Sequence, residues 1–263
     1  MFRLSVCADT IFLDLPLEER ARKIAKAGFL VEFWGWKGRN LDVLSSDPTV
    51  EVCGFSGTQG GSCVHPDGVA DYVAGIAEST MVAKKLAASF LVVHGGELGH
   101  NGEVVHKISH NPATHWITAY KALSQLAKLG EENQITYTLE VLNTKVDHAG
   151  YSINLIEDAV RLVKEVDSPH VKILFDIYHV QVEEGNVVEL LQKYLPYIGH
   201  IHVADVPGRH EPGTGELNCR FVAEALCDAG YKGVVGLEAY PLEDSYQALD
   251  RFRAAFILVK YQN

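Results

Sequence analysis

Four acidic or imidazole side chains each close a short, mostly apolar run of the sequence. They end the runs Thr-Leu-Glu140, Leu-Phe-Asp176, His-Ile-His202 and Gly-Leu-Glu238, at intervals of 36, 26 and 36 residues. A charged residue at the end of a buried strand is costly unless it is paired, hydrogen-bonded or bound to a metal. Three carboxylates and one imidazole that meet at one point would form a divalent-cation site, and some of these groups could also act as bases.

The types of donor narrow the choice of metal. Oxygen ligands with one imidazole suit Mg²⁺ or Mn²⁺, with Co²⁺ as a substitute in vitro, whereas zinc usually takes more nitrogen or sulfur. We therefore expect Glu140, Asp176, His202 and Glu238 to be metal ligands. The alternative is that they cap helices or form surface ion pairs where the strands end.

The elements that must position these residues follow a regular alternation. Eight β-branched, apolar runs predict strands at 3–8, 30–34, 52–56, 90–94, 136–140, 172–176, 200–203 and 234–238. Helical patterns occupy 17–27, 67–88, 113–133, 154–166, 187–195, 219–229 and 245–259. This alternation predicts parallel strands with right-handed crossovers.

Eight such units favour one fold over its main alternative. A single (β/α)8 TIM barrel typically needs about 250 residues, so residues 1–263 fit one domain, and it gathers the carboxyl ends of all its strands at one rim. The alternative is an open α/β sheet. No G-x-G-x-x-G follows the first strand, which removes the main support for a dinucleotide-binding sheet.

Composition excludes several classes of partner. A net charge of −11 disfavours an extended nucleic-acid surface and an anionic membrane surface. The five cysteines are odd in number and form no CxxC pair, which argues against a disulfide framework or a zinc knuckle. The N-terminal sequence lacks the pattern of a signal peptide, and no apolar run approaches the roughly 20 residues that span a bilayer. We therefore expect a cytoplasmic protein that binds neither nucleic acid nor membrane.

Four further residues are candidates for contact with a substrate. His179 follows Asp176 by three positions, and Arg209 lies in a turn-rich loop after His202, where its guanidinium suits a carboxylate or phosphate. His94 closes the fourth strand and Trp34 the second. Each has a structural alternative: a packed or solvated histidine, an Arg–Glu pair within the loop, or a tryptophan in the core or an interface.

Several motifs together resemble the hydroxypyruvate isomerase family, within the xylose-isomerase-like TIM barrels. They are Leu-Glu140-Val-Leu-Asn143, Phe-Asp176-Ile-Tyr-His179-Val-Gln181, Gly-Arg209-His-Glu-Pro-Gly-Thr-Gly-Glu216 and Leu-Glu238-Ala-Tyr-Pro241. The resemblance covers essentially the whole chain. It implies a metal at the four strand-end residues, with Glu140 and Glu238 as the catalytic proton-transfer pair. Related ketose 3-epimerases use the counterparts of His179 and Arg209 on substrate oxygens.

The chain departs from the hydroxypyruvate isomerase pattern at two places. His202 stands where many of these isomerases carry Gln, and His is the epimerase-like residue. The chain reads Glu238-Ala-Tyr-Pro241 where the family tends to read Glu-Tyr-Lys-Pro, so a lysine that could hold a substrate carboxylate is missing. Both departures bear on the substrate and leave the barrel and the metal unaffected.

The resemblance therefore implies a metal-dependent isomerase of the aldose–ketose type, with a small hydroxy-keto acid as substrate. Its expected reaction converts hydroxypyruvate into 2-hydroxy-3-oxopropanoate. Alternatives are a ketose 3-epimerase or another isomerase of small sugars or sugar acids and, more remotely, a sugar-binding barrel without catalysis. Metal-dependent endonucleases share the barrel, but the acidic charge opposes that function. Barrels of this kind also pair readily, which is compatible with a homo-oligomer.

Overall fold

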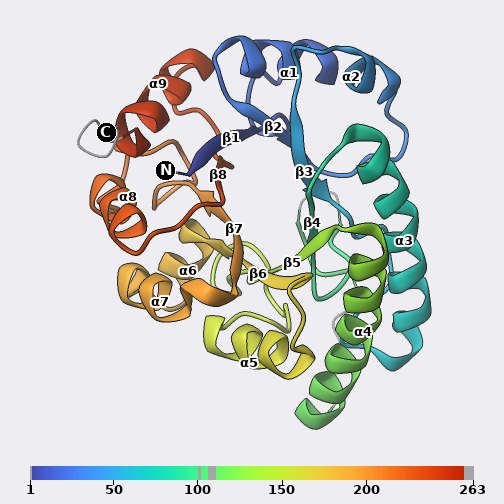
Figure 1. Cartoon of the computed structure of the whole chain (residues 1–263). Coiled ribbons are helices and arrows are strands. Elements are labelled where there is room, and N and C mark those ends of the chain that lie inside the picture. Colours follow the sequence, from blue (N-terminus) through green and yellow to red (C-terminus); the bar gives the residue numbers. More distant parts are fainter. Residues whose placement is uncertain (1, 100–101, 106–110, 258–263) are drawn as a thin grey trace.

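The eight parallel strands of the chain close into a barrel surrounded by helices (Figure 1). A computed structural model describes residues 2–99, 102–105 and 111–257. Within these residues the strands pair in chain order, and β8 pairs with β1 to complete the ring. The strands are β1 Arg3–Cys7, β2 Leu30–Phe33, β3 Val52–Ser56, β4 Phe90–Val93, β5 Thr136–Glu140, β6 Val171–Asp176, β7 Ile198–Val203 and β8 Val234–Leu237.

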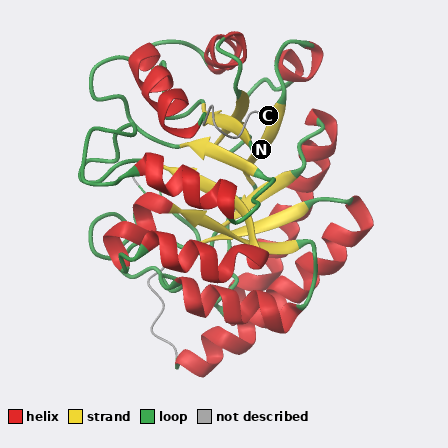
Figure 2. Ribbon diagram, turned by 60° about the vertical axis from the view of Figure 1, so that its left-hand side comes forward, coloured by secondary structure: helices red, strands yellow, loops and turns green. Residues whose placement is uncertain are grey.

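Helices cover the outside of the barrel, as Figure 2 shows from a second direction. In the described part of the chain the α-helices are α1 Leu17–Lys26, α2 Asp42–Ser46, α3 Val69–Leu86, α4 Pro112–Asn133, α5 Ile156–Val166, α6 Ile177–Glu183, α7 Val187–Tyr194, α8 Cys219–Asp228 and α9 Ser245–Phe256. Two 3₁₀ turns, η1 Pro66–Gly68 and η2 Leu195–Tyr197, precede α3 and β7. None of these helices is long and apolar enough to cross a membrane.

The predicted TIM barrel is confirmed, and each predicted strand is present with ends that differ by at most two residues. Two short helices were missed: α2 has five residues and α6 has seven, too few for a helical pattern to stand out. The helix predicted at 67–88 is divided into η1 and α3. The helix predicted at 245–259 ends at Phe256, and residues 258–259 lie outside the described residues.

The alternation of side chains along each strand determines what the barrel encloses. Residues two apart on a strand face the same side. On β5 and β7 the residues Tyr137, Leu139, Ile201 and Val203 belong to the main hydrophobic core. The residues that alternate with them include Glu140 and the histidines of β7, and they share the barrel interior with a small apolar cluster of Leu30, Cys53, Phe90, Val92 and Leu174. The functional candidates thus lie inside the barrel, at its carboxyl-terminal rim.

Candidate active site

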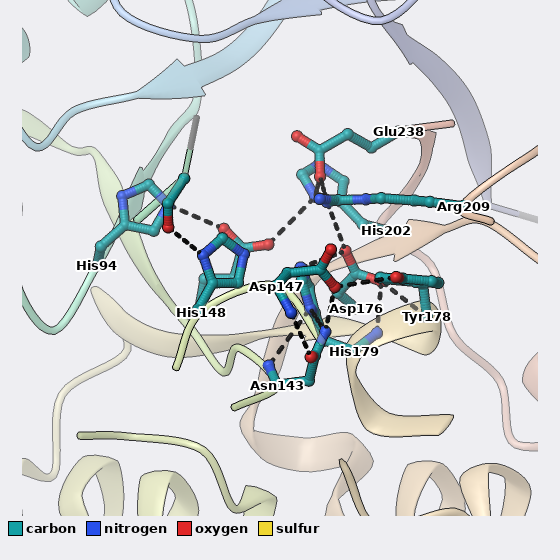
Figure 3. A network of polar contacts seen from close by, with 12 residues as sticks. His94, Asn143, Asp147, His148, Asp176, Tyr178, His179, His202, Arg209 and Glu238 are labelled. Atoms are coloured by element: carbon teal, nitrogen blue, oxygen red, sulfur yellow. Dashed lines mark hydrogen bonds and ion pairs between the residues drawn. The ribbon is translucent and has the colours of Figure 1, made fainter. Parts of the chain in front are cut away.

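The four strand-end residues predicted as metal ligands meet at one point. Figure 3 labels three of them, Asp176, His202 and Glu238. One donor atom from each of Glu140, Asp176, His202 and Glu238 lies within 4.8 Å of the others, and all four side chains are buried. β5 and β6 end on Glu140 and Asp176, Glu238 directly follows β8, and His202 is the penultimate residue of β7. The arrangement arises because parallel strands of a barrel end at one rim.

The two glutamates are held in similar ways, each by a side chain that directly follows a strand of the first half of the chain. The indole Nε1–H of Trp34 donates to Glu238 Oε1 at 2.6 Å, and the Nε2–H of His94 donates to Glu140 Oε2 at 3.0 Å. The other oxygen of each glutamate lies near the Nδ1 of His202, at 3.7 Å for Glu140 Oε1 and 3.5 Å for Glu238 Oε2. His202 Nδ1 therefore lies near two glutamates, each of which also accepts a hydrogen bond from another side chain.

Glu32 fixes the orientation of the His202 ring from within the barrel. The Nε2–H of His202 donates to Glu32 Oε2 at 2.9 Å, which turns Nδ1 towards the glutamates. Glu32 is itself held by Ser5 and by the Nε2–H of His200 at 3.1 Å. Gly236 is required beside this group because a Cβ there would lie 2.5 Å from Glu32 Oε1. A metal-binding histidine typically donates its other N–H to a carboxylate in this way.

The donor set fits a divalent cation on structural grounds. Glu140 Oε1 and His202 Nδ1 are buried and have no hydrogen-bond partner among the described residues. Unpaired buried polar atoms are costly, and a shared cation would satisfy both. Three carboxylates and one imidazole are donors that Mg²⁺ and Mn²⁺ accept. Glu140, Asp176, His202 and Glu238 would therefore hold the ion.

The ionisation of the site favours uptake of positive charge. Burial raises the pKa of Asp176 to about 7. Burial also opposes ionisation of Glu140 and Glu238, but neighbouring imidazoles, and Arg209 beside Glu238, outweigh it and lower both pKa values. Burial works against protonation of His202, yet the adjacent glutamates raise its pKa well above its usual range. The carboxylates thus draw a proton or another cation to this point.

Asp176 also begins the short helix α6, which places His179 in the cleft. Its Oδ1 accepts the backbone N–H groups of Tyr178 and His179 at 2.8 and 3.3 Å, as a helix N-cap does. Its Oδ2 lies 3.7 Å from His179 Nε2. Burial of His179 lowers its pKa well below the usual range, so the ring is neutral near pH 7.

Arg209 reaches the cluster from the loop that follows β7. Its Nη2 pairs with Glu238 and lies 3.4 Å from Asp176 Oδ2, and its guanidinium lies over the ring of Tyr178, 5.2 Å from the ring centre. The alternative for Arg209 was an ion pair with a glutamate of its own loop, whereas its partners are Asp176 and Glu238, two of the candidate metal ligands. Arg209 therefore shares its charge with the site as well as facing the cleft.

The buried carboxylate of Asp205 gives that loop its shape. It accepts the backbone N–H groups of Val206 and Leu217 on Oδ1, at 2.9 and 3.0 Å, and those of Gly213 and Thr214 on Oδ2, at 2.9 and 3.1 Å. Gly215 packs so closely that a Cβ would lie 2.0 Å from the carbonyl oxygen of Val206. These bonds close the loop on itself and present Arg209 to the cleft.

Glu140, His202 and Glu238 of the cluster line a cleft of about 1010 Å³. All four predicted substrate-contact residues, Trp34, His94, His179 and Arg209, line it together with Gln59, Glu97, His148 and Tyr240. Arg209 is the single Lys or Arg among the described residues of this lining. The cleft therefore offers hydrogen-bonding groups and aromatic surface, with one side chain suited to an anionic group.

Three further polar residues of the site lie outside the strands and had no predicted role. Asn143 and His148 lie in the loop after β5, and Asp205 lies just beyond β7. Their contacts depend on how loops fold back, which no regular spacing reveals. The one available signal was that Asn143 and Asp205 are polar residues close behind strand-end candidates.

A profile of the xylose isomerase-like TIM barrel family matches residues 39–255, well over half of the chain. The chain belongs to that family. The likeness extends to a solved structure described as an AP endonuclease, family 2, from Brucella melitensis. It has a TM-score of 0.86 and 27% identity over 97% of this chain and 99% of that one.

Curated relatives of this family match about half of the chain. A human protein named "Putative hydroxypyruvate isomerase" is 37% identical over 117 residues, 44% of this chain and 42% of its own length. The 2-oxo-tetronate isomerase of Cupriavidus necator is 38% identical over 124 residues, 47% of each chain. The D-psicose 3-epimerase of Enterocloster bolteae is 34% identical over 125 residues, 48% of this chain and 40% of its own. The chain thus spans less than half the length of these relatives in the matches, and the resemblance drawn from the motifs is confirmed.

Proposed function

We propose that the protein is a divalent-metal-dependent isomerase of a short α-hydroxy ketone, and that it moves a proton by way of an enediolate. The observation that carries this is the placement of two glutamates, Glu140 and Glu238, close to His202 Nδ1, at 3.7 and 3.5 Å. A binding site alone needs no such pair of bases. The names of the curated relatives support the same class of reaction.

The chain's own residues supply the proton transfer and the positioning. A divalent cation bound at the four donors would polarise the substrate carbonyl and stabilise the enediolate charge. One of Glu140 and Glu238 takes the proton from the carbon that bears the hydroxyl group, and a carboxylate returns a proton to the adjacent carbon. Trp34 and His94 keep the two carboxylates in place through one hydrogen bond each. Arg209 and the Nε2–H of His179 orient the substrate oxygens.

Hydroxypyruvate is the first substrate to test. Transfer of a proton from its C3 to C2, together with transfer of the C3 hydroxyl proton to the C2 oxygen, gives the isomer 2-hydroxy-3-oxopropanoate. Its carboxylate would face Arg209, the single Lys or Arg in the described part of the cleft lining. We infer a metal of the Mg²⁺ or Mn²⁺ type from the same donor set.

A ketose 3-epimerase is the second candidate. Pockets that bury drug-sized ligands have volumes of about 300–1,000 Å³, so a cleft of about 1010 Å³ exceeds what a three-carbon acid needs. Two bases on opposite sides of one carbon would invert its configuration, and the D-psicose 3-epimerase relative supports this version. The acidic cleft disfavours a DNA substrate, despite the name of the Brucella melitensis structure.

The test is proton NMR in D₂O. The purified protein is loaded with Mg²⁺ that contains no Mn²⁺, and hydroxypyruvate and D-psicose are added to separate samples. We expect conversion of one of them with deuterium entering the carbon-bound position. Glu140→Gln and Glu238→Gln should each lower the rate by about 10²–10⁴, the usual contribution of a positioned acid or base. Glu131→Gln, the same change at an exposed residue of α4, should leave the rate unaltered.

The outcomes separate the candidates. Turnover of hydroxypyruvate supports the first substrate, and turnover of D-psicose alone supports the epimerase. Tight metal binding without turnover or deuterium exchange on either compound, or on other short ketoses, would overturn the isomerase and favour a binding protein. A wild-type rate retained by both glutamine variants would remove Glu140 and Glu238 from the chemistry.

A further inference from the structure

Two histidines that come from different segments of the cleft wall approach one another beside the metal cluster. His148, in the loop after β5, and His179, in α6, have ring centres 5.2 Å apart (Figure 3). Both line the cleft, with exposed fractions of 6% and 1%. The Nε2 atom of each ring is buried and has no hydrogen-bond partner among the described residues.

The tautomer of His179 follows from the orientation of Asn143. The amide oxygen of Asn143 accepts the backbone N–H groups of Val146 and Asp147 at 3.0 and 3.1 Å, so its NH₂ group must point the other way. That NH₂ donates to His179 Nδ1 at 2.6 Å and to Asp147 Oδ2 at 2.6 Å. The backbone N–H of Asn143 also donates to the same Nδ1, at 3.3 Å. A nitrogen that accepts hydrogen bonds carries no proton, so the proton of the neutral His179 ring is on Nε2.

The tautomer of His148 is the opposite one. Its Nδ1 lies 2.6 Å from the carbonyl oxygen of Gly102, which can only accept, so Nδ1 carries the proton. Burial lowers the pKa of His148, so the ring is neutral near pH 7 and its Nε2 is a bare acceptor. The two neighbouring rings therefore carry an unsatisfied acceptor, His148 Nε2, and an unsatisfied donor, His179 Nε2–H, which lies 3.7 Å from Asp176 Oδ2.

We propose that His148 and His179 form a complementary pair that recognises one hydroxyl group of the substrate, which accepts from His179 and donates to His148. A hydroxyl group has one donor and two acceptor positions, so a single oxygen can accept from one ring nitrogen and donate to another. A keto or ether oxygen cannot satisfy His148, because it has no proton to donate. His148 is thus a specificity-determining residue for a polyhydroxylated substrate, an assignment that rests on the proposed function of this cleft.

The first part of the test reads the tautomers directly. Long-range ¹H–¹⁵N correlation spectra of histidine-labelled protein distinguish a ring protonated on Nδ1 from one protonated on Nε2, and His148→Phe and His179→Phe assign the signals. We expect His148 in the Nδ1–H form and His179 in the Nε2–H form. His170, at the other end of the barrel, is the internal standard because its Nδ1 lies 3.1 Å from the carbonyl oxygen of Ile135. The same tautomer at both cleft histidines would overturn the proposal.

The second part adds probes to the Mg²⁺-loaded protein: D-psicose, hydroxypyruvate and, as the smallest polyol, glycerol up to molar concentration. We expect at least one probe to shift both cleft Nε2 signals together, while the His170 signals stay in place. His148→Phe should weaken binding of that probe about tenfold, the value of about one hydrogen bond. His148→Gln, which keeps an acceptor at the end of the side chain, should recover most of this loss.

The result is independent of turnover. Absence of isomerase activity with paired shifts would overturn the proposed function and leave the recognition pair intact. Two results, each observed together with turnover, would overturn the pair and leave the proposed function intact. One is a His148 signal that no probe shifts, and the other is equal affinity of the wild type and His148→Phe for the probe.

Discussion

Two buried groups of carboxylates and histidines share His202, yet they differ in one respect. The inner group, Glu32 with His200 and His202, lies inside the barrel, and the rim group consists of Glu140, Asp176, His202 and Glu238. In the inner group both oxygens of Glu32 accept hydrogen bonds, from Ser5 on one side and from the two histidines on the other. In the rim group Glu140 Oε1 and His202 Nδ1 have no hydrogen-bond partner among the described residues.

The difference teaches that donor type and proximity do not by themselves make a metal site. Both groups have donors within reach of one ion, but the carboxylate of the inner group is already satisfied by its neighbours. A fully paired carboxylate has little to gain from a cation, even though His200 Nδ1 beside it has no hydrogen-bond partner among the described residues. The unpaired Glu140 Oε1 of the rim group has the cost of a buried polar atom to recover. We therefore interpret the inner group as residues that position the side chains of the rim group. Three variants test this interpretation.

The largest effect is expected from Asp176→Asn, which acts on the rim group alone. Asparagine keeps the Oδ1 that caps α6 by accepting from Tyr178 and His179, and it removes the charge of the carboxylate. We expect the affinity for Mn²⁺, measured by calorimetry, to fall more than about 100-fold, beyond the usual loss from a supporting residue. Mn²⁺ at 100 times the wild-type Kd should add about 2.7 kcal/mol to the unfolding free energy of the wild type and almost nothing to that of the variant. Equal stabilisation of both would show that the ion binds elsewhere.

An intermediate effect is expected from Glu32→Gln, which acts on the inner group. The change removes the charge that faces His202 Nε2 and orients its ring. Loss of such a supporting carboxylate typically lowers metal affinity about 10–100-fold. The two histidine N–H groups lose a charged acceptor, so the unfolding free energy in urea should fall by about 1–3 kcal/mol. A variant that binds Mn²⁺ more weakly than Asp176→Asn does would reverse our assignment of the two groups.

The smallest effect is expected from Ser5→Ala. Ser5 is fully buried and donates to Glu32, which keeps both histidine partners when the hydroxyl group is removed. The unfolding free energy should fall by about 0.5–1.5 kcal/mol, the usual net value of one hydrogen bond. Mn²⁺ affinity should change less than in Glu32→Gln. A larger loss of affinity here than in Glu32→Gln would mean that Ser5, and not Glu32, determines the position of His202.

The fold and the meeting of the four rim residues were predictable because both depend on regular features. Apolar runs at regular intervals predict parallel strands, and the ends of parallel strands in a barrel meet at one rim. Glu140 and Glu238, almost 100 residues apart in the sequence, therefore come together without any information about loops. That they bind a metal and transfer protons remains a prediction.

Features that depend on particular side chains across the barrel were not predictable. Glu32 on β2 reaches His202 on β7, two strands that are not neighbours in the sheet, so no pairing rule connects them. The contact of Trp34 with Glu238 likewise crosses from one half of the sequence to the other. The tautomers of His148 and His179 depend on loop carbonyl and amide groups, whose positions the sequence pattern does not contain.

The four hydrogen bonds that Asp205 accepts have a consequence for the speed of recognition. They tie the start of the loop to residues 213, 214 and 217, so the backbone that carries Arg209 needs no ligand to take its shape. Binding that must first order a loop loses conformational entropy and slows association. On this side of the cleft the loop is already folded when a substrate arrives. The rate of association there is therefore determined by diffusion and by the orientation of the substrate at the entrance.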